Sequence, residues 1–208
     1  LGLLEEDCRA RNDYARLRDL LMGAAAVTAL SPQTRQQRLR KAASICETKL
    51  ADLDGTLAAV RALVALDPKD ADARRELARL LEAGNRWDEL AQLWHTTALG
   101  TTDLGEKALI YRRLTRLHRE QRNDTVEAIQ ALRCLREVRP DDAGVRNELC
   151  AALLAAGAFL EAVPLLRQRA DEHAPGPERA RSLLVLATVL EEHLGDDEGA
   201  FEVAARVL

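Results

Sequence analysis

The chain has 208 residues, of which 47% are hydrophobic, 31% charged and only 3% aromatic. Alanine and leucine dominate while glycine and proline are sparse, which favours an all-helical protein, and two Trp, two Tyr and two Phe exclude a typical β-sandwich core. The net charge of −4 excludes a basic footprint for nucleic acid or an anionic membrane over the chain as a whole.

The sequence also bears on compartment and redox state. No apolar run approaches the roughly 20 residues that span a bilayer, and the N-terminus lacks a basic region followed by an apolar one. We expect an excerpt of a longer protein, without membrane insertion and cytoplasmic, with the periplasm left open if a signal peptide has been removed. Three of the cysteines fall at apolar helix positions, so we expect reduced, buried thiols at Cys8, Cys46 and Cys150, while Cys134 completes the four.

The first quarter of the chain predicts three helices. One covers Leu1 to Arg11, and Asn12-Asp13 caps a second that extends to about Leu30. Ser31-Pro32 is a helix-start signal, with Ser as the N-cap and Pro in the first turn. The third helix carries an apolar stripe with steps of 3, 1, 3 and 4, formed by Leu39, Ala42, Ala43, Cys46 and Leu50.

This pattern returns along the chain. Residues 50–57 are followed at an offset of 72 by residues 122–129 and at an offset of 144 by residues 194–201, and each octapeptide has aspartate third. The apolar stripe also has an apolar counterpart at every position 144 residues later. The aspartates Asp52, Asp124 and Asp196 therefore mark turns between paired helices rather than catalytic carboxylates.

Helix ends and turns set the period. Asp67-Pro68 and Arg139-Pro140 stop two helices, because proline cannot continue a helix. The residues Thr56, Leu90, Ala128, Ala162 and Ala200, which follow equivalent turns, are spaced 34, 38, 34 and 38 apart. The sequence thus predicts a single array of about six helix pairs, with approximate repeats 1–30, 31–68, 69–102, 103–140, 141–175 and 176–208.

Two segments show how each pair is built: Leu77-Ala78, Leu81, residues 84–90 and Trp94 in one, and residues 127–129, Leu132, Leu135 and Pro140 in the other. A helix–turn–helix unit near 34 residues with these features resembles the tetratricopeptide repeat. The resemblance implies an all-α, right-handed α-solenoid of antiparallel helix pairs, stabilised by stacking between neighbours. It implies that small side chains allow close helix approach at Ala43, Ala78, Thr115, Cys150 and Ala187.

No residue pattern predicts catalysis. The histidines His95, His118, His173 and His193 have neither HExxH spacing nor a shared face with a cysteine pair, and His118 occupies the slot of Cys46 and Leu190. Paired carboxylates need only capping and the helix dipole as explanation. Phosphate-binding loops and a GxSxG motif are missing from the sequence. We expect no enzyme activity, no cofactor and no metal in this chain.

Tetratricopeptide arrays generally bind peptides or partner helices along their concave face, which the first helix of each pair lines. We expect partner contacts from side chains beside the apolar stripe: Arg75, Arg79, Arg112, Arg116, Arg119, Asn147, Leu154 and Leu184. The arginines suit carboxylates or phosphates of a partner, and the leucines suit apolar anchors. The competing interpretation is a solvated face that Glu76, Glu82 and Glu120 neutralise. The lysine–asparagine pairs that hold a C-terminal carboxylate in chaperone-binding members are missing at the corresponding positions.

The resemblance therefore implies a non-catalytic scaffold for a protein or peptide, with an acidic segment as one option. The alternative is a regulatory or substrate-recruiting arm of an enzyme whose catalytic domain lies outside this chain. RNA binding is disfavoured by the acidic balance and by the lack of a regular aromatic or amide code. Self-association through exposed ends of the array is a further option.

Overall fold

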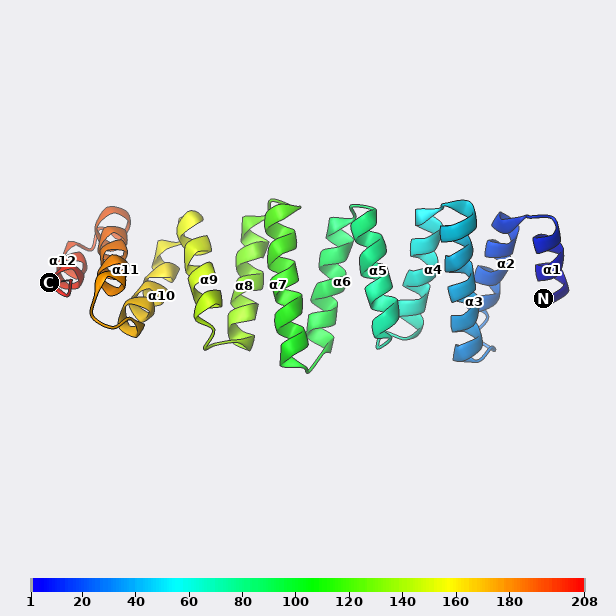
Figure 1. Cartoon of the computed structure of the whole chain (residues 1–208), viewed down its shortest axis with the longest axis horizontal. Helices are drawn as coiled ribbons and strands as arrows, with labels where there is room; N and C mark the ends of the chain where they lie inside the picture. The colour runs from blue at the N-terminus through cyan, green and yellow to red at the C-terminus, as the bar shows by residue number, and fades with distance from the viewer. Residues whose placement is uncertain (1, 208) are drawn as a thin grey trace. The chain divides into compact units, whose positions relative to one another are not determined.

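The computed structural model describes residues 2–207, and these residues form twelve α-helices and no strand (Figure 1). Successive helices form pairs joined by short turns. The pairs are α1 (Gly2–Ala10) with α2 (Tyr14–Ala26), α3 (Pro32–Ile45) with α4 (Leu53–Leu66), α5 (Ala71–Ala83) with α6 (Trp87–Gly100), α7 (Leu104–Glu120) with α8 (Thr125–Val138), α9 (Ala143–Ala155) with α10 (Phe159–Glu172), and α11 (Pro177–Thr188) with α12 (Asp197–Ala205). One π-helical turn follows α3, η1 (Cys46–Leu50), and another follows α11, η2 (Val189–His193).

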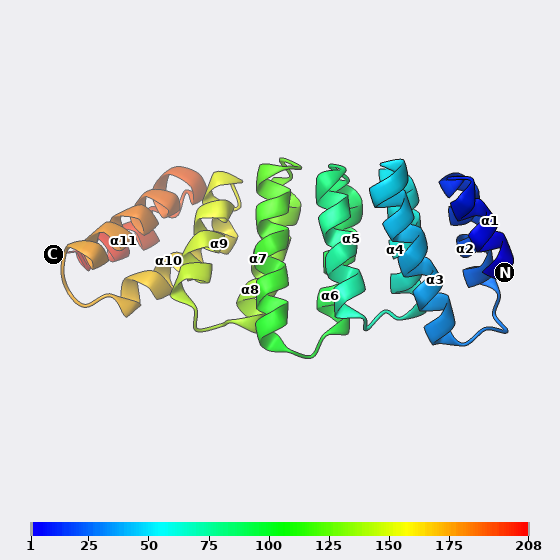
Figure 2. The same ribbon diagram turned by 45° about the vertical axis from the view of Figure 1, so that its right-hand side comes forward.

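The chain divides into two compact units, residues 1–93 and 94–208. In the first unit each helix from α1 to α4 packs on the next one, and in the second unit the same holds from α7 to α11. Figures 1 and 2 show α3 beside α4, and α7 beside α8, as antiparallel neighbours. The predicted class, an all-α protein of antiparallel helix pairs, is confirmed, whereas the superhelix, its hand and the repeat boundaries stay predictions.

Aspartates begin the second helix of the long pairs, as their 72-residue spacing predicts. Asp52 accepts a hydrogen bond from Gly55 N at 2.9 Å, and Asp196 accepts one from Gly199 N at 2.9 Å. Asp124 accepts the equivalent bond from Glu127 N at 3.1 Å. Each carboxylate satisfies an amide that has no partner within its helix.

The turns before these aspartates require a left-handed backbone. Ala51, Asn123 and Gly195 have φ values of 50°, 50° and 65°, and the following aspartate amide donates back across the turn to the carbonyl six residues earlier. In the short pairs, Asn85 and Gly157 have φ values of 53° and 73°, and the bond spans five residues. Long and short pairs therefore end their first helices differently, and each ending recurs after 72 residues.

The predicted end of the second helix at Leu30 is wrong, because α2 ends at Ala26. Two arginines of α3 satisfy the last carbonyls of α2: Arg35 Nε donates to Ala25 O at 2.7 Å, and an Arg38 guanidinium nitrogen donates to Ala24 O at 3.1 Å. The β-branched side chains at Val27 and Thr28 also favour an extended backbone. The stop depends on contacts with another helix, which spacing along the sequence does not show.

Leucines and small residues fill the space between helices. In the first unit, Leu17 and Leu21 of α2 pack with Ala42 of α3 and Ala59 of α4. In the second unit, the largest fully buried side chains are leucines, at positions 132, 135, 153, 165, 166, 183 and 186. Of the positions predicted to permit close helix approach, Thr115, Cys150 and Ala187 are buried, while Ala43 and Ala78 are half-buried.

Candidate partner-binding face

The predicted arginines of α5 are exposed but paired with carboxylates. Arg75 lies 2.9 Å from Asp72 on the same helix. Arg79 contacts Glu76 and, from the preceding pair, Glu47, each at 2.6 Å. Glu76 first and Glu47 second raise the pKa of Arg79 above its ordinary value. Arg79 therefore joins two helix pairs, whereas Arg75 has only a local partner.

The arginines of α7 show the same division. Arg112 reaches Asp142 at the start of α9, and Arg119 reaches Glu148 within α9, both at 2.9 Å. Arg116 instead pairs with Glu120 one turn along its own helix, also at 2.9 Å, and its side chain is 77% exposed. Hydrogen bonding to Glu120 raises the pKa of Arg116. Two of these three arginines thus connect neighbouring pairs.

Two bridges between neighbouring pairs recur with the 72-residue period. The contact of Arg40 with Asp70 at 3.1 Å is repeated by Arg112 and Asp142, and the contact of Arg61 with Glu89 is repeated by Arg133 and Glu161. The sequence contains the signal for these bridges, because each partner returns at the same offset. Reasoning from the apolar stripe alone missed it.

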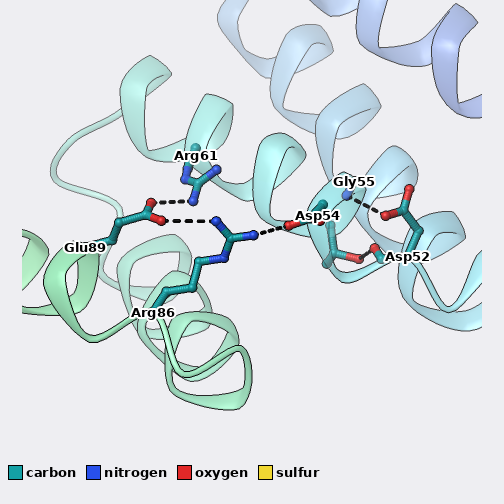
Figure 3. Close-up of polar contacts among 7 residues, drawn as sticks. Asp52, Asp54, Gly55, Arg61, Arg86 and Glu89 are labelled. Carbon is teal, nitrogen blue, oxygen red and sulfur yellow. Dashed lines mark hydrogen bonds and ion pairs between the residues drawn. The ribbon is translucent and has the colours of Figure 1, made fainter. Parts of the chain in front are cut away.

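Figure 3 shows one such contact as part of a larger network. Glu89 lies between two arginines: one oxygen accepts from Arg61, and the other accepts from Arg86 at 3.4 Å. Arg86 also donates to Asp54. These side chains extend from α4, α6 and the turn before α6, so the network ties the second helices of adjacent pairs.

The remaining predicted contact residues lie on α9 and α11. Asn147 is exposed, Leu154 is half-buried, and Leu184 is exposed beside the exposed Val185. A shallow hollow of about 590 Å³ adjoins Arg112, with Leu109 of α7 and Pro140 after α8 in its lining. Polar and apolar groups therefore both remain accessible on first helices of the second unit.

Three thiols and one histidine inside the helix pairs favour their uncharged forms. Burial raises the pKa values of the Cys46, Cys134 and Cys150 thiols, which keeps them protonated and poorly nucleophilic. Burial, and then the charge of Arg122, lower the pKa of His118. The Nδ1 atom of His118 lies 3.1 Å from an Arg122 guanidinium nitrogen, and the side chain is buried at the position equivalent to Cys46 and Leu190.

Residues 2–207 hold no group of three or more His, Cys, Asp or Glu side chains placed to ligate a metal ion. Within the same residues, every helix is too short or too polar to cross a bilayer.

These helix pairs, with their recurring caps and turns, define an all-α helical-repeat protein. The chain matches no family model and no curated protein. It is similar in fold to solved structures with low sequence identity. A structure titled "Crystal structure of MamA" is 15% identical with a TM-score of 0.42, over 79% of this chain and 91% of that chain.

Two further structures share this level of similarity. YrrB, titled a TPR protein with an unusual peptide-binding site, is 14% identical with a TM-score of 0.43, over 82% of this chain and 83% of that chain. PilF of Pseudomonas aeruginosa is 16% identical with a TM-score of 0.40, over 99% of this chain and 87% of that chain. Similarity this distant concerns fold class and carries nothing about a ligand.

Proposed function

We propose that this chain is a non-catalytic scaffold that binds a peptide or partner segment on the exposed face of its first helices. The observation that carries the proposal is the division among the exposed arginines. Arg79, Arg112 and Arg119 link neighbouring pairs, while Arg75 and Arg116 have only same-helix partners. Exposed pairs three or four residues apart contribute only about 0.3–0.5 kcal/mol, so a partner carboxylate can replace Asp72 or Glu120 at little cost.

The proposed partner is an acidic segment with aliphatic residues. In the second unit Arg116 supplies a planar guanidinium group for a carboxylate, and in the first unit Arg75 offers the same group separately. Leu184 and the half-buried Leu154 supply apolar contacts. Asn147 adds an exposed amide that can donate and accept hydrogen bonds with a peptide backbone.

A random peptide display library tests the proposal. Peptides retained by the chain should be acidic and aliphatic, and Arg116→Gln should weaken binding about tenfold, as expected for one charge-assisted hydrogen bond. Arg136→Gln, an exposed arginine on the second helix α8, is the matched control and should bind as the parent does. Fluorescence anisotropy gives the dissociation constants. Failure to select any peptide, or equal loss in both variants, contradicts the proposal.

A charge swap separates binding from folding at Arg119. The double substitution Arg119→Glu with Glu148→Arg keeps an ion pair between α7 and α9 but exchanges its two ends. If Arg119 only links helices, stability and peptide affinity should both stay near parental values. A large loss of affinity with unchanged thermal stability would instead make Arg119 a contact residue.

Self-association is a second proposed interaction. Exposed large apolar side chains include Leu3 on α1 and Phe201 on α12, with exposed fractions of 84% and 76%. Light scattering over a concentration series should show a rising mass that Phe201→Glu abolishes. A constant monomer mass in the parent chain would exclude association through Phe201.

A further inference from the structure

A basic hollow lies among the first three helices, within the first unit. Its volume is about 400 Å³, and its polar lining comes from Arg9, Tyr14, Lys41, Ser44, Thr48 and Lys49. Leu17 and Ile45 supply apolar lining. Arg9 belongs to α1 and Tyr14 begins α2, while the other polar residues lie on α3 and η1. Figure 2 labels α1, α2 and α3 at the N-terminal end of the chain.

The cations of this basic hollow differ from the arginines described above in how closely carboxylates pair with them. Among the described residues Lys41 has no ion-pair partner, and Lys49 faces the Tyr14 ring, with its Nζ 5.7 Å from the ring centroid. The chain has only four lysines, and two of them line this hollow. Arg9 has a carboxylate partner, Glu5, at the long distance of 3.7 Å.

Few carboxylates counter this charge. Glu47, next to Thr48, is held by Arg79 of the following helix pair. Asp13 caps α2 and accepts from Arg16 N at 3.1 Å. Three cations with one weakly held carboxylate leave a net charge of about +2, which matches a dianion better than a single carboxylate.

The neutral groups of the basic hollow also fit an anion with several acceptor oxygens. The Thr48 hydroxyl donates to Ser44 O at 2.7 Å, whereas the Ser44 hydroxyl makes no hydrogen bond within residues 2–207 and is free to donate. Leu17, Ile45 and the Tyr14 ring can contact the carbon atoms that carry the anion.

We propose that the basic hollow binds a phosphate monoester carried by a phosphorylated peptide side chain. Lys41, Lys49 and Arg9 bind the phosphate oxygens, Ser44 donates a hydrogen bond, and the apolar lining contacts the neighbouring peptide carbons. A phosphoserine carries about −1.5 to −2 charges and three strong acceptors at neutral pH. The peptide carrier rests on the proposed scaffold function, while the phosphate chemistry rests on the basic hollow alone.

Amide chemical shifts of the whole ¹⁵N-labelled chain, titrated with defined probes, test this site. The probes are one capped heptapeptide with phosphoserine at its centre and aliphatic neighbours, the same peptide with serine or glutamate there, free phosphoserine and inorganic phosphate. The phosphopeptide should give saturable shifts confined to residues 9–17 and 41–49. Its affinity should exceed that of the glutamate peptide by about tenfold, because the phosphate carries more charge and more acceptors.

Lysine variants supply the matched comparison. The double variant Lys41→Gln with Lys49→Gln should weaken phosphopeptide binding at least about tenfold, since two charge-assisted contacts are lost. Lys69→Gln makes the same chemical change at an exposed lysine outside the basic hollow and should leave binding within about twofold of the parent. Circular dichroism confirms that each variant is folded.

Each contrary outcome removes a defined part of the proposal. Shifts elsewhere, or equal losses in the Lys69 control, overturn the site, and equal affinity for the glutamate peptide overturns the phosphate chemistry. Equal affinity for free phosphoserine overturns the peptide carrier in favour of a small phosphate ester. Library-selected peptides that bind outside the basic hollow would leave the scaffold function intact while this site fails.

Discussion

Single residues show how strictly the 72-residue period constrains the backbone. Ala51, Asn123 and Gly195 occupy the same left-handed turn position, yet only glycine and asparagine adopt that conformation readily. Ala51 therefore carries a local strain that its two counterparts avoid. The alternation of turns was predictable from the sequence, but the sign of φ at an alanine was not.

Replacing Ala51 with glycine should stabilise the chain. Removing the left-handed alanine should stabilise the folded chain by about 1–2 kcal/mol. The greater chain entropy of glycine in the unfolded state costs about 0.5–1 kcal/mol. The free energy of unfolding should therefore rise by roughly 0.5–1 kcal/mol. Urea denaturation measures it. Ala58→Gly, at an exposed position inside α4, is the control and should destabilise by a similar amount. A loss of stability in Ala51→Gly would contradict the strain.

His118 should make stability depend on pH. Burial lowers its folded pKa below the ordinary value of 6.5, so the unfolded chain binds the proton more readily. The stabilisation is complete above pH 6.5 and is lost as the pH falls toward the folded pKa. Its charged neighbours include Arg122, Glu127, Asp124 and His95.

The variant His118→Leu should remove this dependence, because leucine fills the equivalent slot at Leu190. Denaturation midpoints at pH 7.5 and 5.5 should then nearly coincide. His173→Gln, a half-buried histidine at the end of α10 and outside the charges that act on His118, is the control and should retain the parental difference. An unchanged pH dependence in His118→Leu would show that another group titrates.

At the scale of elements, helix ends depend on capping residues, which can be read from the sequence, and on contacts with other helices, which cannot. Ser31 was predicted as a helix start and the recurring aspartates as turn residues, and all of them cap the helix that follows, because capping residues act within three residues of their targets. The end of α2 was not predicted, because Arg35 and Arg38 reach it from another helix. Local signals therefore place starts better than stops here.

Substitutions at Asp52 separate the stability contributed by the helix cap from the stability contributed by an ion pair. One oxygen accepts from Gly55 N, as Figure 3 shows, and the other accepts from Arg18 at 3.0 Å. Asp52→Asn keeps the cap and should cost at most about 1 kcal/mol. Asp52→Ala loses both contacts and should cost about 1–3 kcal/mol in total. Thermal denaturation ranks them, and equal costs would mean that the cap contributes nothing.

At the scale of the whole molecule, each pair depends on its neighbours, because one pair cannot cover its own apolar stripe. Leu77 is only 6% exposed, whereas Leu99 is 66% exposed. Contacts between buried leucines of successive helices therefore contribute most of the stability, while the exposed ion pairs add little individually.

Cutting Leu77 to alanine should cost about 2–5 kcal/mol, and Leu99→Ala should stay within about 0.5 kcal/mol. Denaturant titration gives these values. Hydrogen exchange should show reduced protection in α3, α4 and α5 of the first unit, because the damaged helix packs within that unit. A Leu77→Ala variant as stable as the parent would contradict the apolar register.

The sequence by itself determined the helix-pair class, the 72-residue period, the aspartates at the turns and the equivalence of His118 with Cys46 and Leu190, because these follow from local spacing and recurrence. It also named the exposed first-helix residues. Only the tertiary structure decided which of those arginines link neighbouring pairs and which keep a merely local partner. It also revealed the hollow around Lys41 and Lys49. Charge pairing and hollows depend on side chains from different helices, and their distances are set by packing rather than by spacing along one helix.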